Sequence, residues 1–298
     1  MKNLIKLCII LIATVLAMPH AFAQKDTHKE HWIKIFNGKN LSGWDIKIAQ
    51  HPLNDNFKKT FRVDSGMLRV SYDQYQKFNN QFGHLYYKTP LSYYKIKMQY
   101  RFLGNHVPDA PEYANGNSGI MIHSQSAQSL SIDQTFPVSL EIQLLGGLYI
   151  GKRTTGNVCT PGTQVSMNGV LRAEHCIDSK SKFYDNENWV NILVEVYGDS
   201  LIRSTVEGEN VLEFQKPTTD KYFVNAEHNW TTAHVLDSIS WINKSGTPLT
   251  KGYVALQAES QNIDFRNIEL LNLEGCMDPL AINYKAYYVK SDKTKCRY

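Results

Sequence analysis

Short runs of alternating apolar and polar residues, separated by turn residues, constrain the fold of this chain more than any other feature. Residues 94–102 place an apolar side chain at every second position, and so do residues 190–196. Successive side chains of a strand point to opposite faces, so a period of two predicts strands with one buried face. Turn residues follow at 198–200 and 207–210, and no stretch carries the apolar stripe of an amphipathic helix. The pattern predicts an all-β antiparallel sandwich or barrel over about 240 residues.

The N-terminal segment, residues 1–23, has the features of a secretory signal peptide. A short basic start precedes the apolar residues 7–18, and a small-x-small cleavage site follows at 21–23. A membrane span needs about 20 apolar residues, which this run does not reach. Cys8 lies inside the apolar run rather than after it, which disfavours lipid attachment. We therefore expect an exported mature chain without a membrane span.

Four cysteines remain after the predicted cleavage: Cys159, Cys176, Cys276 and Cys296. An even number in an oxidising compartment favours disulfides. Proximity in sequence suggests Cys159–Cys176 and Cys276–Cys296, with the two other pairings left open. A metal site is disfavoured because the chain has no Cys-x-x-Cys and because His175 directly precedes Cys176.

The charge balance argues against a nucleic-acid partner. Lys and Arg number 32 against 28 Asp and Glu, and no run of five like charges occurs. The 17 Tyr, 12 Phe and 5 Trp suit either sugar stacking or a β-rich core. Nucleophile elbows, phosphate-binding loops and His-Glu-x-x-His zinc motifs are absent from the sequence.

The chemically interesting residues lie on two strands between irregular loops at 104–118 and 146–170. On the first strand, Glu141 and Gln143 point to the same face, which indicates either a cleft floor or an ordinary solvent-facing surface. On the second, Asn117 and His123 share a face. A single histidine is more often structural than catalytic, but beside Glu141 it becomes an acid–base partner.

The number of carboxylates on this strand bears on the reaction. Ordinary glycoside hydrolysis uses two carboxylates across the scissile bond. The strand at 139–144 supplies only Glu141, so a second would have to come from elsewhere. A single carboxylate suits a different task, which is the removal of a proton from an acidic carbon.

Five motifs occur in order: Ile35 to Trp44 (IFNGKNLSGW), Asn-Ser-Gly at 117–119, Glu-x-Gln at 141–143, Trp-Val-Asn at 189–191 and Phe-Arg-Asn-Ile at 265–268. Together they resemble the 3-keto-disaccharide hydrolase domain family over residues 32–273. The resemblance implies a two-sheet jelly roll similar to concanavalin A-like lectins and glucanases. It divides the chain into a signal peptide (1–23), this domain (24–274) and a short tail (275–298).

The resemblance also implies a reaction, cleavage of glycosides that carry a ketone at sugar carbon 3. The ketone acidifies the hydrogen on carbon 2, a base removes it, and the group on carbon 1 leaves. Water then adds, or the unsaturated product is released, so the outcome is that of a hydrolase or a lyase. Glu141 is the candidate base, or a metal ligand if one divalent ion polarises the ketone.

The resemblance suggests roles for further residues. His123 stands where many relatives carry arginine and is an acid, a metal ligand beside Glu141, or polar lining. Many members carry a basic residue directly before Asn-Ser-Gly, and this chain has Gly116 there. Whether the substrate is contacted at this position is therefore left open. The candidate substrate-binding residues are Asn117, Gln143, Gln257, Glu259 and Trp44, and the last is equally suited to the core.

The tail at 275–298 resembles a short cysteine-bracketed motif that is appended to secreted bacterial proteins. Twenty-four residues are too few for a core of their own, so a disulfide staple and a packed cap on the sandwich are expected. The preferred function is that of an enzyme in the bacterial periplasm or outside the cell, with an oxidised glycoside as partner. The alternatives are a lectin-like module that binds sugar without turnover and a cell-surface interaction protein.

Overall fold

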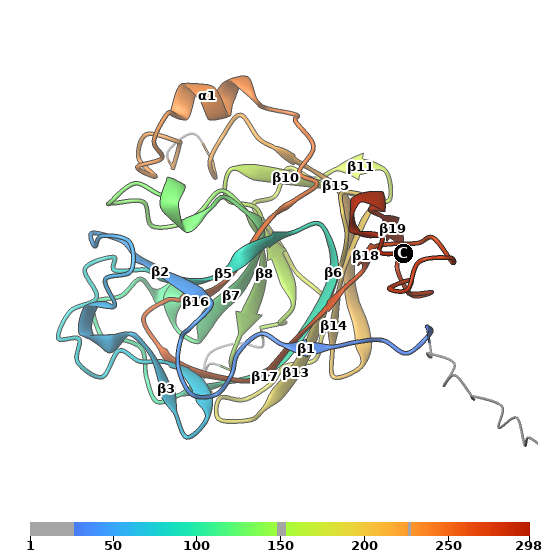
Figure 1. Ribbon diagram of the computed structural model, residues 1–298. Helices are drawn as coiled ribbons and strands as arrows, with labels where there is room; N and C mark the ends of the chain where they lie inside the picture. The colour runs from blue at the N-terminus through green and yellow to red at the C-terminus, as the bar shows by residue number, and fades with distance from the viewer. Residues whose placement is uncertain (1–26, 148–152, 226–227) are drawn as a thin grey trace, which may run out of the picture.

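The fold is a two-layer β-sandwich, as predicted (Figure 1). The structure is a computed structural model and describes residues 27–147, 153–225 and 228–298. The predicted signal peptide, residues 1–23, therefore lies outside the described residues. Among the residues described, no helix is both long and apolar enough to cross a membrane.

Two large antiparallel sheets form the layers. The ten-stranded sheet has the order β11 (Val170–Leu171), β10 (Thr163–Met167), β15 (Glu209–Thr219), β14 (Leu201–Val206), β13 (Val190–Tyr197), β6 (Tyr93–Leu103), β17 (Asn262–Asn272), β4 (Met67–Val70), β3 (Phe61–Asp64), with β1 (Ile33–Lys34) beside β17. The seven-stranded sheet has the order β12 (Cys176–Ile177), β9 (Asn157–Cys159), β8 (Leu140–Leu145), β7 (Asn117–Ser124), β16 (Gly252–Ala258), β5 (Gly83–Leu91), β2 (Trp44–Ile48). The candidate site lies on the seven-stranded sheet.

The core fills the space between the sheets and explains the alternation in the sequence. On β8, Leu140, Ile142 and Leu144 are fully buried in this core, while Glu141 and Gln143 point to the outer face of the sheet. Strand β6 alternates in the same way along its whole length. Burial of one face of each sheet stabilises the sandwich and leaves the outer face of the seven-stranded sheet for polar groups.

In the part of the chain that the structure describes, the helices are short and lie in the connections. They are α1 (Ser238–Asn243) and the 3-10 turns η1 (Phe57–Lys59), η2 (Glu112–Ala114), η3 (Ala127–Ser129) and η4 (Lys293–Lys295). The Asp237 side chain accepts a hydrogen bond from the backbone N–H of Ser240 and so caps α1. A helix of six residues is too short to leave a periodic apolar stripe, which explains why the sequence did not predict it.

Both predicted disulfides are confirmed. Cys159–Cys176 joins the neighbouring strands β9 and β12, in which the two residues are direct register partners. Cys276–Cys296 closes the tail, where β18 (Glu274–Gly275) pairs with β19 (Lys290–Ser291). The tail is tied back to the sandwich by a backbone hydrogen bond from Val289 to Leu273 of 2.9 Å.

Removal of the Cys159–Cys176 disulfide has a predictable effect on stability. The bridge spans 17 residues of sequence. A closed loop of this size restricts the unfolded chain by about 3 kcal/mol in the chain-entropy model. We expect the double variant Cys159→Ser/Cys176→Ser to lose about 3 kcal/mol of unfolding free energy in urea titration. An unchanged urea midpoint would contradict this.

Candidate functional site

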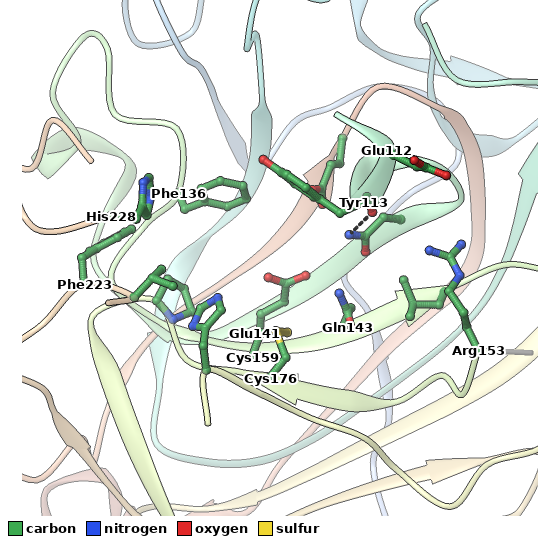
Figure 2. A pocket seen from close by; sticks show the side chains of 16 residues that line it. Glu112, Tyr113, Phe136, Glu141, Gln143, Arg153, Cys159, Cys176, Phe223 and His228 are labelled. Carbon is green, nitrogen blue, oxygen red and sulfur yellow. Dashed lines mark hydrogen bonds between the residues drawn. A yellow bond between two sulfur atoms is a disulfide. The ribbon is translucent and has the colours of Figure 1, made fainter. Parts of the chain in front are cut away.

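A pocket of about 670 Å³ opens on the outer face of the seven-stranded sheet. Strands β7, β8, β9 and β12 contribute to its floor, and the connecting segments line its walls with residues 112, 113, 136, 153, 223, 224 and 228. Glu141 lies near its middle, above the Cys159–Cys176 disulfide (Figure 2). The volume lies within the range of pockets that hold small organic ligands.

Strand register places Glu141 on this floor. Glu141 of β8 pairs with Met121 of β7 and with Cys159 of β9, and register partners share a face of the sheet. Next along the strand, Gln143 pairs with Gly119. A Cβ atom at Gly119 would lie 2.6 Å from both Cγ and Oε1 of Glu141, so the Glu141 side chain lies over the bare backbone of this glycine.

The Glu141 carboxyl is buried and incompletely bonded. It is 5% exposed, and its Oε1 atom has no hydrogen-bond partner. Burial disfavours the charged form and raises the pKa of Glu141 to about 8. An acid with a raised pKa and a free oxygen in a pocket is a candidate for proton transfer.

A second buried carboxyl, Glu259, shares the pocket with Glu141. It follows β16, lines the pocket and is 2% exposed. Burial, followed by the charge of Glu141, holds the pKa of Glu259 well above its usual range, while Arg153 opposes this shift. The pocket thus contains the second carboxylate that the strand at 139–144 does not supply. Two carboxyl groups that repel each other in a buried site ionise in separate steps.

Arg153 provides a cation in the same pocket, and sequence reasoning missed it. Its Nη2 atom donates to the carbonyl oxygens of Asn115 at 2.7 Å, Gly146 at 3.0 Å and Gly116 at 3.2 Å, whereas its buried Nε atom has no partner. A Cβ atom at Gly116 would lie 2.8 Å from Nη2. The missing side chain at 116 therefore leaves room for the Arg153 guanidinium.

The pocket brings together two of the predicted sugar-binding amides. Asn117 donates through Nδ2 to the Tyr113 carbonyl at 3.0 Å, drawn as a dashed line in Figure 2, and its buried Oδ1 has no partner. Gln143 accepts from Asn157 at 3.2 Å and lines the pocket beside Glu141. Free amide atoms of this kind suit sugar hydroxyl groups.

The structure does not bring His123 to Glu141. His123 has a φ of 48°, and the pairing of β7 with β16 shifts register beside it. This bulge places the ring Nε2 atom 3.0 Å from the carbonyl oxygen of Gly198, in the turn between β13 and β14 of the other sheet. His123 therefore points away from the pocket that Glu141 lines, and the structure does not place the two side chains side by side. Within the described part of the chain, no group of three or more His, Cys, Asp or Glu is placed to hold a metal ion.

Trp44 and Gln257 also lie outside the pocket lining. Trp44 is 4% exposed in the core, and its Nε1 atom donates to the Ile35 carbonyl at 3.0 Å, so its ring is not available for sugar stacking. Gln257 is fully buried on β16, where neither of its amide atoms has a partner.

The end of the pocket away from Arg153 is apolar. Figure 2 shows Phe136, Phe223 and His228 on one side of Glu141, and Gln143 and Arg153 on the other. Loops rather than strands provide this apolar wall and Arg153. Loop residues leave no periodic signal in the sequence. The only available indication was that irregular loops flank the strand that carries Glu141 and Gln143.

Several solved structures are similar to the chain at low identity. A candidate glycosyl hydrolase from Parabacteroides distasonis is 16% identical with a TM-score of 0.47, over 82% of this chain and 100% of that one. A carbohydrate-binding module from Bacillus subtilis is 9% identical with a TM-score of 0.42, over 77% and 96%. A protein of unknown function with a galectin-like fold, also from Bacillus subtilis, is 11% identical with a TM-score of 0.49, over 82% and 98%. These likenesses are too distant to bear on function.

A search of curated proteins found no match to the chain. The sequence model of one family does match, over residues 31–271, which is most of the chain and includes the strands and loops that build the pocket. Its description is 3-keto-alpha-glucoside-1,2-lyase-like domain. The chain therefore belongs to the 3-keto-alpha-glucoside-1,2-lyase-like domain family.

Proposed function

We propose that this protein cleaves glycosides that carry a ketone at sugar carbon 3, by removal of the proton on carbon 2 and elimination of the group on carbon 1. The observation that carries the proposal is the Glu141 carboxyl, which is buried on the pocket floor with Oε1 free and its pKa raised to about 8. A base of raised pKa matches an acidic C–H group better than an ordinary carboxylate does.

The two carboxyl groups divide the proton transfers between them. We assign the base to Glu141 and the acid to Glu259: burial raises the pKa of both carboxyls, and once Glu141 is ionised its charge holds the pKa of Glu259 well above its usual range. Ionised Glu141 takes the proton from carbon 2, and the C–H electron pair forms the enolate. The enolate then expels the oxygen on carbon 1, and protonated Glu259 donates its proton to that oxygen. The aglycone leaves as an alcohol, and the sugar leaves as an unsaturated ketone that water can hydrate.

The remaining polar residues stabilise and orient the substrate. The Arg153 guanidinium keeps an unbonded Nε atom and offers charge to the enolate oxygen. Asn117 Oδ1 accepts from a sugar hydroxyl, and Gln143 contributes a second amide contact. This scheme needs only residues that line the pocket.

The test is product release from a 3-keto-glucoside beside the unoxidised glucoside, by the purified mature protein, with and without a chelator. Cleavage of the keto substrate alone is expected, and the chelator decides the role of Glu141, because a metal ligand would lose its function on chelation and a base would not. Equal cleavage of both glucosides would indicate ordinary two-carboxylate hydrolysis. Binding of sugar without cleavage of either would favour a lectin-like module.

Gly119→Ala should lower activity without unfolding the protein. The added methyl would meet Cγ and Oε1 of Glu141 at 2.6 Å, and the end of this flexible side chain can move aside. A displacement of about 1 Å in a catalytic group lowers the rate roughly 100-fold. We expect a loss of that size in kcat/KM with a nearly unchanged melting temperature. Full activity in this variant would contradict the position assigned to Glu141.

We further propose that the mature protein works outside the cytoplasm. The two disulfides support this placement, because such bonds persist in oxidising compartments. The proposed organisation is a signal peptide at 1–23, the enzyme domain at 24–274 and a stapled tail at 275–298.

A further inference from the structure

The pocket has two ends of different chemistry, and Glu141 lies between them (Figure 2). Free hydrogen-bonding atoms of Asn117 and Arg153 lie toward one end. The other end has the rings of Phe136 and Phe223, with Val224 beside Phe223 in sequence and Pro161 next to Gly162, whose N–H donates to the Phe223 carbonyl. A sugar needs partners for its hydroxyl groups, so it fits the polar end.

The reaction geometry then determines what the apolar end receives. The proton removed by Glu141 is on carbon 2, and the leaving group is on the adjacent carbon 1. With the oxygen on carbon 3 at Arg153 and carbon 2 at Glu141, carbon 1 is the neighbour of carbon 2 that lies away from Arg153, so its bond to the leaving group runs toward Phe136 and Phe223. The apolar end is therefore the place of the aglycone.

We infer that this end is a subsite for an aglycone with an apolar ring, such as an aromatic alcohol, and that the preferred substrates are 3-keto-glycosides of such alcohols rather than 3-keto-disaccharides. The inference rests on the proposed function, because it takes Glu141 as the base. A second sugar would leave its hydroxyl groups unpaired against this wall, and each unpaired group weakens binding. A ring buries apolar surface there instead.

The two histidines at this end do not add charge. Burial lowers the pKa of His175 to about 4, and burial together with His234 lowers the pKa of His228. Both rings are therefore neutral at neutral pH. The buried Nδ1 atom of His175 has no partner and offers one hydrogen-bonding position to a hydroxyl group on the aglycone ring.

The apolar wall is held in place before a ligand arrives. Phe223 accepts from the backbone N–H of Gly162 at 2.6 Å and packs against Trp230 with ring centroids 5.5 Å apart. Phe136 packs on Phe82, with ring centroids 4.6 Å apart. A preformed wall loses little conformational entropy on binding, which favours selectivity for a rigid ring.

The test compares 3-keto-glucosides of 2-phenylethanol and ethanol, whose leaving groups are both primary alkoxides, with a 3-keto-disaccharide as a third substrate. Burial of the phenyl ring should raise kcat/KM for the phenylethyl substrate about 10- to 100-fold over the ethyl substrate. Phe136→Ala should reduce this ratio about 10-fold. A ratio near 1 in the parent, or a preference for the disaccharide, would overturn the inference.

Two additions keep the test decisive. Val224→Asn should also reduce the ratio of kcat/KM between the phenylethyl and ethyl substrates. This second variant serves as the test if the Phe136→Ala protein does not fold. Tyr222→Ala is the matched control, because Tyr222 is 45% exposed and does not line this pocket; it should keep the parent ratio.

If no keto substrate is cleaved, the proposed function fails by itself. Calorimetric titration with unoxidised 2-phenylethyl and ethyl glucosides then tests the subsite, and equal affinities would refute it.

Discussion

Glu141→Gln should abolish cleavage of 3-keto-glycosides while sugar binding remains. The amide keeps the size and hydrogen-bonding reach of the carboxyl but cannot accept a proton from carbon 2. Loss of a general base lowers the rate by about 100- to 10,000-fold. The measurement is kcat on a 3-keto-glucoside beside the dissociation constant of the unoxidised glucoside. A variant that retains more than a tenth of the parent kcat would show that another residue is the base.

The same substitution should stabilise the protein, and in a pH-dependent manner. Burial raises the pKa of Glu141 from 4.5 to about 8, so between these values the folded chain binds more protons than the unfolded chain. Stability of the parent therefore falls as pH rises through this window, and at pH 7 the loss is about 3 kcal/mol. Glutamine does not ionise, so Glu141→Gln should be more stable than the parent at pH 7 and equally stable near pH 4. Parallel stability curves for the two proteins would argue against a buried, protonated Glu141.

Glu259→Gln should change the pH profile of the reaction as well as its rate. In the parent, kcat/KM should rise with pH through about 8 as Glu141 ionises, and fall at higher pH as Glu259 loses its proton. The variant has no acid to lose, so the fall at high pH should disappear, and the rate should drop about 100-fold. An aglycone that is itself a good leaving group needs no protonation and should restore much of this loss.

The control for this prediction is Glu112→Gln, the same chemical change at another carboxylate of the pocket wall. Glu112 has no part in the proposed proton transfers, so its variant should keep both limbs of the profile. If Glu259→Gln retains the fall at high pH, the proton donor is another group, and the assignment of Glu259 fails.

The architecture was predictable because it depends on local alternation and short turns. Period-two runs such as 94–102 lie in strands whose buried face is the core, and the register of β8 follows from the apolar set at Leu140, Ile142 and Leu144. The two disulfides followed from proximity along the chain. Glu141 and Gln143 were identified as one polar face, because strand periodicity by itself assigns them to the side opposite the core.

The parts that sequence did not predict depend on a bulge and on loops. Strand periodicity places His123 beside Glu141, but one left-handed residue in β7 turns its ring toward Gly198. Arg153 reaches the pocket from an irregular segment, at the place where Gly116 has no side chain. The apolar wall comes from Phe136 and Phe223, which are distant in sequence and adjacent only through the packing of their loops.

The most direct test of the central claim follows the hydrogen on carbon 2. A 3-keto-glucoside with deuterium at carbon 2 is treated with the protein in ordinary water, and the sugar product is analysed by mass spectrometry beside an enzyme-free control. Elimination must break this bond, so the product should have lost the deuterium to solvent, and Glu141→Gln should release almost no product. A product that retains the deuterium would show displacement at carbon 1 without proton removal and would contradict the account.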